Sequence, residues 1–312
     1  MRSETTLKPI VGARHAVPLQ SVWVAVFLSL LLLGSSGSGI KVEVFPAAEG
    51  GRVHLSQGQA LFVQVESEEA QIEKVAVSIF GKTLPLGKSG AGWLELLGVD
   101  MDQKPGDYVL VLSLSLADGR KVKREVRVRI ARRDYGTDHL TLPPEKVELT
   151  PEALAQVQAD QQALAQAWRT PSLEAWWSGA FIRPVPGEVS GQFGRRRVIN
   201  GERKSPHTGQ DLRAVMDEPI KASNAGRVAL VRDCFFSGNS VVLDHGLGLY
   251  SMYFHLDQAK VKEGDRVEKG QVIGLAGMTG RATGPHLHWG FRLLGARVDP
   301  DAILALPLGS GL

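Results

Sequence analysis

The amino-terminal part of the chain alternates apolar and polar residues in short segments. Four such segments between residues 41 and 130 are rich in β-branched residues, and Gly, Asp or Pro separates them: "ALFVQVE" (60–66), "KVAVSIF" (74–80), "DYVLVLSLSL" (107–116) and "VKREVRVRI" (122–130). Successive side chains of a strand point to opposite faces, so alternation indicates a strand with one buried face. We therefore predict a domain of strands over residues 40–131.

The turn "ADG" at residues 117–119 selects one hairpin register. If Gly119 takes the left-handed conformation in a three-residue loop, Leu114 faces Val122. A two-residue loop shifts one strand by a residue and sets the leucines against charged side chains. We predict the first register, and with it a small β-sandwich of immunoglobulin-like type.

The periodicity changes between residues 132 and 180. In "LTPEALAQVQADQQALAQAW", Thr150 is placed to cap a helix and Pro151 to be its first residue. Four apolar residues fall near one face of a 3.6-residue period. They are Leu154, Val157, Leu164 and Trp168. This pattern predicts an amphipathic connector helix that Thr170-Pro171 ends and that packs on a neighbouring domain.

Beyond residue 181 the chain is rich in glycine and again reads as short strands. They are "RVALVR" (227–232), "SVVLDH" (240–245), "LYSMYFHL" (249–256), "QVIGLAG" (271–277) and "HLHWGFR" (286–292). Because no long helix separates them, we predict a mostly antiparallel sheet over residues 181–312. The fold class is therefore mainly β, with two strand-rich domains joined by a helix.

The first 39 residues have the composition of an export leader. "VWVAVFLSLLLL" (22–33) follows a basic segment and precedes "GSSGSG". The apolar run is shorter than the roughly 20 residues that span a bilayer. The leader is either a cleaved signal peptide or an uncleaved membrane anchor through residues 22–33. Either one places the rest of the chain outside the cytoplasm, in the periplasm or cell envelope.

Charge and cysteine content exclude several classes of partner and site. Residues 41–312 carry 33 basic and 32 acidic side chains, which is too balanced for a phosphate-binding face, so we expect no nucleic-acid partner. "GRRR" (194–197) is better explained as a solvated face or as a contact with acidic groups of a cell wall. The single Cys234 allows no internal disulfide and no cysteine-based zinc site.

Histidines and one aspartate concentrate in the last domain. Five of the 8 histidines lie between residues 207 and 288, and "HLHWG" sets His286 and His288 on one face of a predicted strand. His207 and Asp211 are four residues apart with a glycine between them. A catalytic zinc typically takes three nitrogen or oxygen ligands and leaves a position for water. The set predicts such a site, with histidines to spare for proton transfer.

Residues 181–300 resemble the LytM or lysostaphin-type zinc metalloendopeptidases, which cleave peptide cross-links in peptidoglycan. The resemblance rests on "FGRR" (193–196), "PHTGQDL" (206–212), "NAGRV" (224–228), "LDHGLGLYSMYFHL" (243–256), "VKEGDRVEKGQVIGLAGMTG" (261–280) and "TGPHLHWGF" (283–291). It implies that His207, Asp211 and His288 bind Zn²⁺. It also implies that His255 and His286 are the catalytic pair that positions water and stabilises the oxyanion.

The resemblance also provides a rival function. LytM-type domains that have lost zinc ligands act as non-catalytic activators of separate cell-wall amidases. This chain keeps all five residues, which favours the hydrolase that uses a water nucleophile and peptidoglycan as its substrate. His245, in a "DHG" turn, is expected to be structural. The amino-terminal half either regulates access to the site or spaces the enzyme from the membrane.

Overall fold

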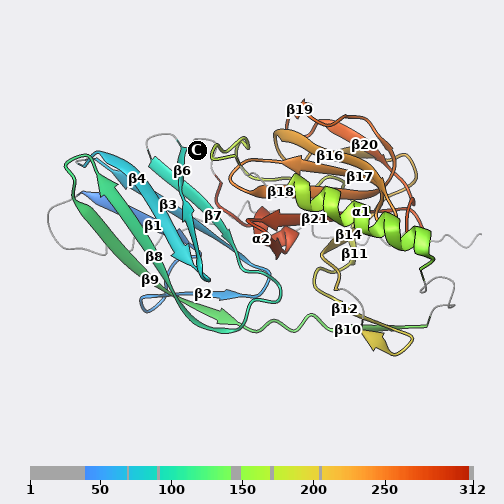
Figure 1. Ribbon diagram of the computed structural model, residues 1–312, viewed down its shortest axis with the longest axis horizontal. Helices are drawn as coiled ribbons and strands as arrows, with labels where there is room; N and C mark the ends of the chain where they lie inside the picture. The colour runs from blue at the N-terminus through green and yellow to red at the C-terminus, as the bar shows by residue number, and fades with distance from the viewer. Residues whose placement is uncertain are drawn as a thin grey trace, which may run out of the picture.

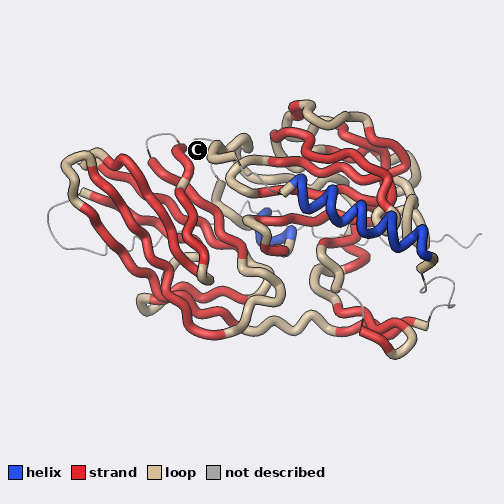
Figure 2. The backbone as a smooth tube through the Cα atoms, in the orientation of Figure 1, coloured by secondary structure: helices blue, strands red, loops and turns tan. Residues whose placement is uncertain are grey.

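The computed structural model describes residues 39–68, 70–89, 92–141, 149–168, 172–203 and 206–308. The apolar segment 22–33 and the Thr170-Pro171 pair lie outside these residues. No helix in the described ranges combines the length and hydropathy needed to cross a bilayer. Strands dominate the two halves of the molecule, which lie side by side, and one long helix crosses the face of the second half (Figure 1, Figure 2).

The amino-terminal half is a two-sheet sandwich, as the alternation predicts. One sheet has the order β1-β3-β7-β6 and the other β2-β9-β8-β4-β5. The strands of the first are β1 (Ile40–Phe45), β3 (Ala60–Ser67), β7 (Gly92–Gly98) and β6 (Gly87–Ser89). Those of the second are β2 (Arg52–Ser56), β9 (Lys121–Ala131), β8 (Gly106–Leu116), β4 (Ile72–Ile79) and β5 (Lys82–Pro85). Valine, leucine and isoleucine side chains from both sheets fill the space between them.

The predicted hairpin register is confirmed. Leu114 pairs with Val122 across β8 and β9, and Gly119 has a φ of 82° in the loop. The amide of Leu116 donates to the carbonyl of Arg120, which closes a three-residue loop. The leucine face of β8 is therefore buried, while the charged residues of β9 face solvent.

The predicted helix is α1 (Pro151–Ala167), and the Thr150 hydroxyl accepts a hydrogen bond from the amide of Ala153. Leu164 and Trp168 pack on a cluster of Leu230, Val242, Tyr250 and Met252 in the second half. Leu154, predicted on the buried face, is 48% exposed, so that assignment is wrong. Leu154 lies in the first turn of α1, and the residues of the helix that pack on the sheet come later in the chain.

The second half is built on a ten-stranded sheet in which every pairing is antiparallel, as predicted. Its main path is β11 (Val189–Gly191), β14 (Gly209–Arg213), β21 (His286–Leu293), β18 (Leu249–Ala259), β17 (Gly238–Asp244), β16 (Gly226–Cys234) and β19 (Arg266–Val267). Off this path lie β15 (Pro219–Lys221), β20 (Val272–Ala276) and β22 (Ala296–Val298). The helix α2 (Pro300–Leu304) follows β22.

A small three-stranded sheet joins the connector to the second half. It contains β10 (Thr137–Leu140), β12 (Arg196–Ile199) and β13 (Glu202–Arg203), with β10 parallel to β12. The connector therefore pairs with the segment that carries "GRRR". The domain boundaries at 131 and 180 themselves stay a prediction.

The two halves share apolar packing and ion pairs. Leu94 and Leu96 of β7 belong to the same buried cluster as Leu293 and Val298 of the second half. A Cβ atom added to Gly98 would lie 2.8 Å from the Ala296 side chain, so the sheets approach closely there. Arg297 reaches across to the carboxylates of Asp100 and Asp102, at 2.6 and 2.8 Å.

Candidate metal centre

Two adjacent strands place the predicted ligands on one face. In the antiparallel register of β14 and β21, Asp211 lies opposite His288 and Arg213 lies opposite His286. Residues opposite each other in such a pair point to the same side of the sheet, so both histidines share a face with Asp211. His207 precedes β14 in a turn that ends at Gly209. A Cβ atom there would lie 2.4 Å from the Trp289 carbonyl oxygen, so the close approach of the two strands requires glycine.

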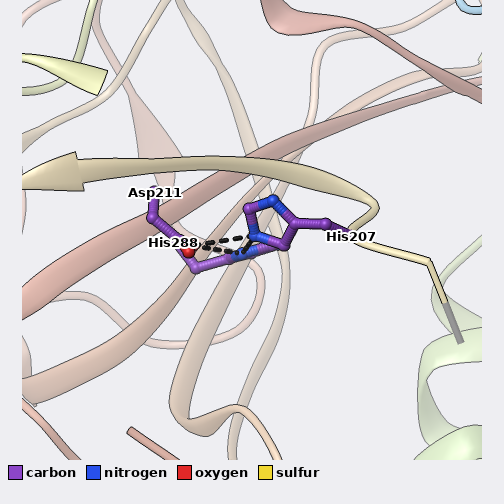
Figure 3. A group of neighbouring side chains, drawn as sticks. All are labelled: His207, Asp211 and His288. Carbon is purple, nitrogen blue, oxygen red and sulfur yellow. Dashed lines mark hydrogen bonds and ion pairs between the residues drawn. The ribbon is translucent and has the colours of Figure 1, made fainter. Parts of the chain in front are cut away.

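The three candidate ligand atoms converge on one point (Figure 3). His207 Nε2 lies 2.9 Å from Asp211 Oδ1 and 3.0 Å from His288 Nδ1. His288 Nδ1 lies 2.9 Å from the same Asp211 oxygen. Atoms this close to one another can all lie at the 2.0–2.2 Å that zinc requires.

The hydrogen bonds around His207 also fit a zinc ligand. Its Nδ1–H donates to the Gln192 carbonyl at 2.8 Å, which leaves Nε2 without a proton and directed at the other ligands. A ligating histidine usually has its second nitrogen held in this way. Two imidazoles and a carboxylate are the nitrogen and oxygen donors that catalytic zinc prefers, so the residues present fit Zn²⁺.

Burial and charge favour the protonation states in which these ligands bind a cation. Burial opposes ionisation of Asp211, but the ring nitrogens of His207 and His288 outweigh it and hold the pKa of this carboxyl well below its usual range. Burial lowers the pKa of His288, although Asp211 partly offsets that effect. The carboxylate is therefore ionised and the His288 ring favours its neutral form, which are the forms that bind a metal.

His286 projects beside the three ligands from the same strand as His288. Its Nδ1 donates to the Gly284 carbonyl at 2.8 Å, and its Nε2 lies 3.8 Å from Asp211 Oδ1. The ring is half-buried, with 20% of the side chain exposed. The free Nε2 therefore faces the ligand cluster at a distance longer than a hydrogen bond.

His255 reaches the same face because the backbone of β18 departs from regular strand geometry there. Its φ is +63°, which is uncommon for a residue other than glycine. The preceding Phe254 stacks on the His288 ring at 5.4 Å, while the His255 ring lies 4.8 Å from that of His286. His255 Nδ1 donates to the Thr279 carbonyl at 2.9 Å, so its Nε2 is the free nitrogen. Burial lowers the pKa of His255 to about 4, which keeps the ring neutral near pH 7.

Residues 205–300 match peptidase family M23. They form an M23 peptidase domain. A crystal structure of a Pseudomonas aeruginosa protein described as an M23 peptidase superposes with a TM-score of 0.58 at 29% identity. The superposition covers 88% of this chain and 97% of that one, so the shared fold extends beyond the M23 domain into the amino-terminal half.

Two curated relatives match part of the chain. Over 36% of its length the chain is 39% identical to peptidoglycan DD-endopeptidase ShyA of Vibrio cholerae, and the match covers 26% of that protein. Over 41% of its length it is 41% identical to DD-carboxypeptidase/endopeptidase Mpg of Neisseria meningitidis, and the match covers 30% of that protein. The chain thus matches between a quarter and a third of the length of these relatives.

The structure brings all five sequence-predicted residues of the M23 domain to one face. It keeps His245 apart from them, fully buried, with Nδ1 2.7 Å from the Ala225 carbonyl and Nε2 2.7 Å from the Ser251 hydroxyl. Both nitrogens of His245 are therefore used within the core, in keeping with a structural residue.

Sequence reasoning missed the roles of the arginines around the site. The sequence explains "GRRR" as a solvated face or as a contact with acidic groups of a cell wall, and it does not indicate the neighbours within the chain: Arg195 pairs with Asp138, Arg196 with Asp102, and Arg197 lies 4.0 Å from Asp211. The motif was visible, but its acidic partners lie 14 to 94 residues away in the chain, so no local pattern indicated them.

Proposed function

We propose that this chain is a zinc-dependent endopeptidase that hydrolyses peptide cross-links of bacterial peptidoglycan. One observation carries the proposal: a three-residue zinc donor set, His207, Asp211 and His288, lies beside two further histidines whose Nε2 atoms form no hydrogen bond with another described residue. A purely structural zinc site has four protein ligands and no need of such neighbours.

The residues have distinct roles in this reaction. His207, Asp211 and His288 would hold Zn²⁺, which when bound acidifies water and polarises the scissile carbonyl. His255 is neutral and partly shielded from solvent, so its Nε2 can accept a proton from the attacking water. The His286 ring, when it carries a proton on Nε2 as well as on Nδ1, can donate from Nε2 to the oxyanion of the tetrahedral intermediate. One of these two rings then returns a proton to the departing amine.

The backbone carbonyls behind the two histidines are part of this arrangement. The Gly284 and Thr279 carbonyls accept from Nδ1 of His286 and His255, so each ring is fixed in orientation and in tautomer. A ring held this way presents the same nitrogen to every substrate, which reduces the entropy lost on reaching the transition state.

The peptidoglycan substrate is supported by the relatives ShyA, a peptidoglycan DD-endopeptidase, and Mpg, a DD-carboxypeptidase/endopeptidase. We propose the same wall for this chain, with export by residues 1–39 and the site outside the cytoplasm. The leader is then either cleaved or retained as a membrane anchor through residues 22–33.

The experiment is digestion of purified sacculi by the mature chain at measured zinc content, followed by analysis of the released muropeptides. We expect the chain to release muropeptides whose peptide cross-links have been cut. The Asp211→Ala variant should release none. If the zinc-loaded chain releases nothing but accelerates an added cell-wall amidase, the chain is a non-catalytic activator and the hydrolase proposal is wrong.

A further inference from the structure

Helix α1 carries a carboxylate on its buried face. Asp160 lies three residues after Val157 and four residues before Leu164, so the three side chains share the face that packs on the second half. Only 8% of the Asp160 side chain is exposed. A buried carboxylate is unfavourable unless it is paired and hydrogen-bonded, so the contacts of Asp160 show what this position requires.

Both oxygens of Asp160 bind the end of strand β16. Oδ1 accepts a hydrogen bond from Arg232 Nε at 2.7 Å, and Oδ2 accepts one from the backbone amide of Phe235 at 2.8 Å. Phe235 is the first residue of the turn that joins β16 to β17. Asp160 therefore restrains the main chain of this turn as well as a side chain of the strand before it.

The same turn holds the backbone of His255. The His255 amide donates to the Ser237 carbonyl at 2.8 Å. The register of β17 and β18 shifts between Asn239 and Val241, and His255 lies at this irregularity with a φ of +63°. A residue other than glycine keeps such a conformation only where its surroundings hold it. The turn is thus one of the contacts that direct His255 toward the metal centre.

The turn also supports the acceptor of the His255 ring. A Cβ atom on Gly238 would lie 2.3 Å from Thr279 Oγ1, so the two segments are in close contact. The amide of Asn239 donates to the Thr279 hydroxyl at 2.9 Å. The Thr279 carbonyl in turn accepts from His255 Nδ1 at 2.9 Å. A displacement of residues 235–239 would therefore disturb both the backbone and the ring of His255.

The ion pair with Arg232 is the lesser of the two contacts of Asp160. The Arg232 side chain is 36% exposed, and an ion pair that water reaches contributes little. The hydrogen bond from the Phe235 amide acts on the main chain, two residues before the Ser237 carbonyl that holds His255. The structure thus links Asp160 to His255 by a short series of backbone contacts.

We propose that Asp160 is a positioning residue for the peptidase reaction. Through the Phe235 amide it fixes the turn 235–239, and this turn sets the backbone and the ring of His255. Asp160 acts through His255, so it affects the rate of the chemical step rather than the binding of substrate. The inference rests on the proposed function, in which His255 accepts a proton from the attacking water. It gives the connector helix a role in the site.

The variants Asp160→Leu and Asp160→Asn separate the hydrogen bond from packing. The two new side chains have nearly the same branched shape, but only asparagine keeps an oxygen that can accept from the Phe235 amide. Leucine suits the apolar face of the helix, so this variant should fold. With cross-linked muropeptides and the full chain at matched zinc content, we expect Asp160→Leu to lower kcat by about 10²-fold, the effect of a misplaced reacting group, and to leave KM nearly unchanged. Asp160→Asn should keep most of the parent kcat.

Arg232→Gln is the control for the ion pair. It removes the charge beside Asp160 Oδ1 and leaves the Phe235 amide with its acceptor, so kcat should stay near that of the parent chain. A loss of kcat as large as that in Asp160→Leu would assign the effect to the ion pair and overturn the inference. Parent kcat in Asp160→Leu, or an effect confined to KM, would overturn it as well.

Nuclear magnetic resonance of the His255 ring separates this inference from the proposed function. In the zinc-loaded full chain with isotope-labelled histidine, the ring should carry its proton on Nδ1, because the Thr279 carbonyl accepts it. The His255→Ala chain identifies the signals. Asp160→Leu should give a mixture of the two tautomers, and Asp160→Asn the parent pattern.

That result supports the positioning role of Asp160 even if the parent chain hydrolyses no muropeptide. A His255 tautomer that is unchanged in Asp160→Leu refutes the role whether or not the chain is a hydrolase.

Discussion

Each half of the molecule buries a carboxyl group, and the two groups behave in opposite ways. Asp211 lies between two imidazoles, and its pKa falls well below the usual range. Glu95 in β7 is 3% exposed and lies opposite Val63, on the strand face that looks into the sandwich core. Burial raises the pKa of Glu95 to about 8, and the amide of Leu96, 3.0 Å away, offsets it only in part.

The difference shows that burial alone does not make a metal site. Removal from water disfavours the ionised form of both carboxyls. Glu95 has one backbone amide beside it, whereas Asp211 lies against two imidazole rings, whose interactions reverse the balance. Glu95 is accordingly a neutral acid in an apolar core near pH 7, whereas Asp211 is an anion ready for a cation.

The largest effect should come from replacing the site carboxylate by its amide. In Asp211→Asn the negative ligand is lost, so we expect zinc content to fall and wall hydrolysis to reach background. Elemental analysis of the purified variant and muropeptide release are the measurements. His207→Ala and His288→Ala should behave alike, and retention of one zinc per chain in any of the three would remove that residue from the ligand set.

Next in size are the two histidines assigned to proton transfer and oxyanion stabilisation. His255→Ala and His286→Ala should each lower kcat by roughly 10²–10⁴-fold, the range of a lost acid–base group, with zinc still bound. The control is the metal content of each variant. Loss of zinc in the His286 variant would exchange the roles of His286 and His288.

The other half of the comparison is tested by Glu95→Gln. Below pH 4.5 Glu95 is protonated both folded and unfolded, and the substitution should change little. Between pH 4.5 and about 8 the unfolded chain loses this proton and the folded chain keeps it, so the free energy of unfolding falls as pH rises. The variant avoids this loss and should be more stable by about 3 kcal/mol at pH 7.

Urea denaturation of parent and variant at pH 4.5 and pH 7 measures this effect, and peptidase activity should be unchanged. A stability difference that is equal at the two pH values would mean that Glu95 is not protonated in the folded chain.

The smallest effect concerns a third buried carboxylate, Asp160 of α1. It pairs with Arg232 at 2.7 Å and accepts from the amide of Phe235 at 2.8 Å. Asp160→Ala leaves that amide unpaired and should cost about 2 kcal/mol of stability. Leu154→Ala, on the exposed side of the same helix, should cost much less. Thermal unfolding of both variants decides whether this buried carboxylate, unlike Glu95, stabilises the fold.

Local sequence patterns predicted the strands well because alternation and turn residues act within a few positions. The register of β8 and β9 followed from the three-residue loop at Gly119 and from keeping the leucine face away from charged side chains. The helix start followed from Thr150 and Pro151. The exposure of Leu154 could not be predicted from the sequence. Periodicity shows which residues share a face of the helix, but not which part of that face the sheet covers.

The sequence by itself determined the chemistry of the site. Two histidines on one strand face, a His-x-x-x-Asp turn and a further histidine indicated the candidate donors, and the family resemblance divided them into predicted metal ligands and a predicted catalytic pair. Tertiary structure decided what surrounds them: the positive φ that turns His255 inward, the carbonyls that set each tautomer, and the cation Arg197. It also decided that Asp211 is an anion and Glu95 an acid. The physical reason is that pKa and charge depend on distances across strands, and residues far apart in the chain set those distances.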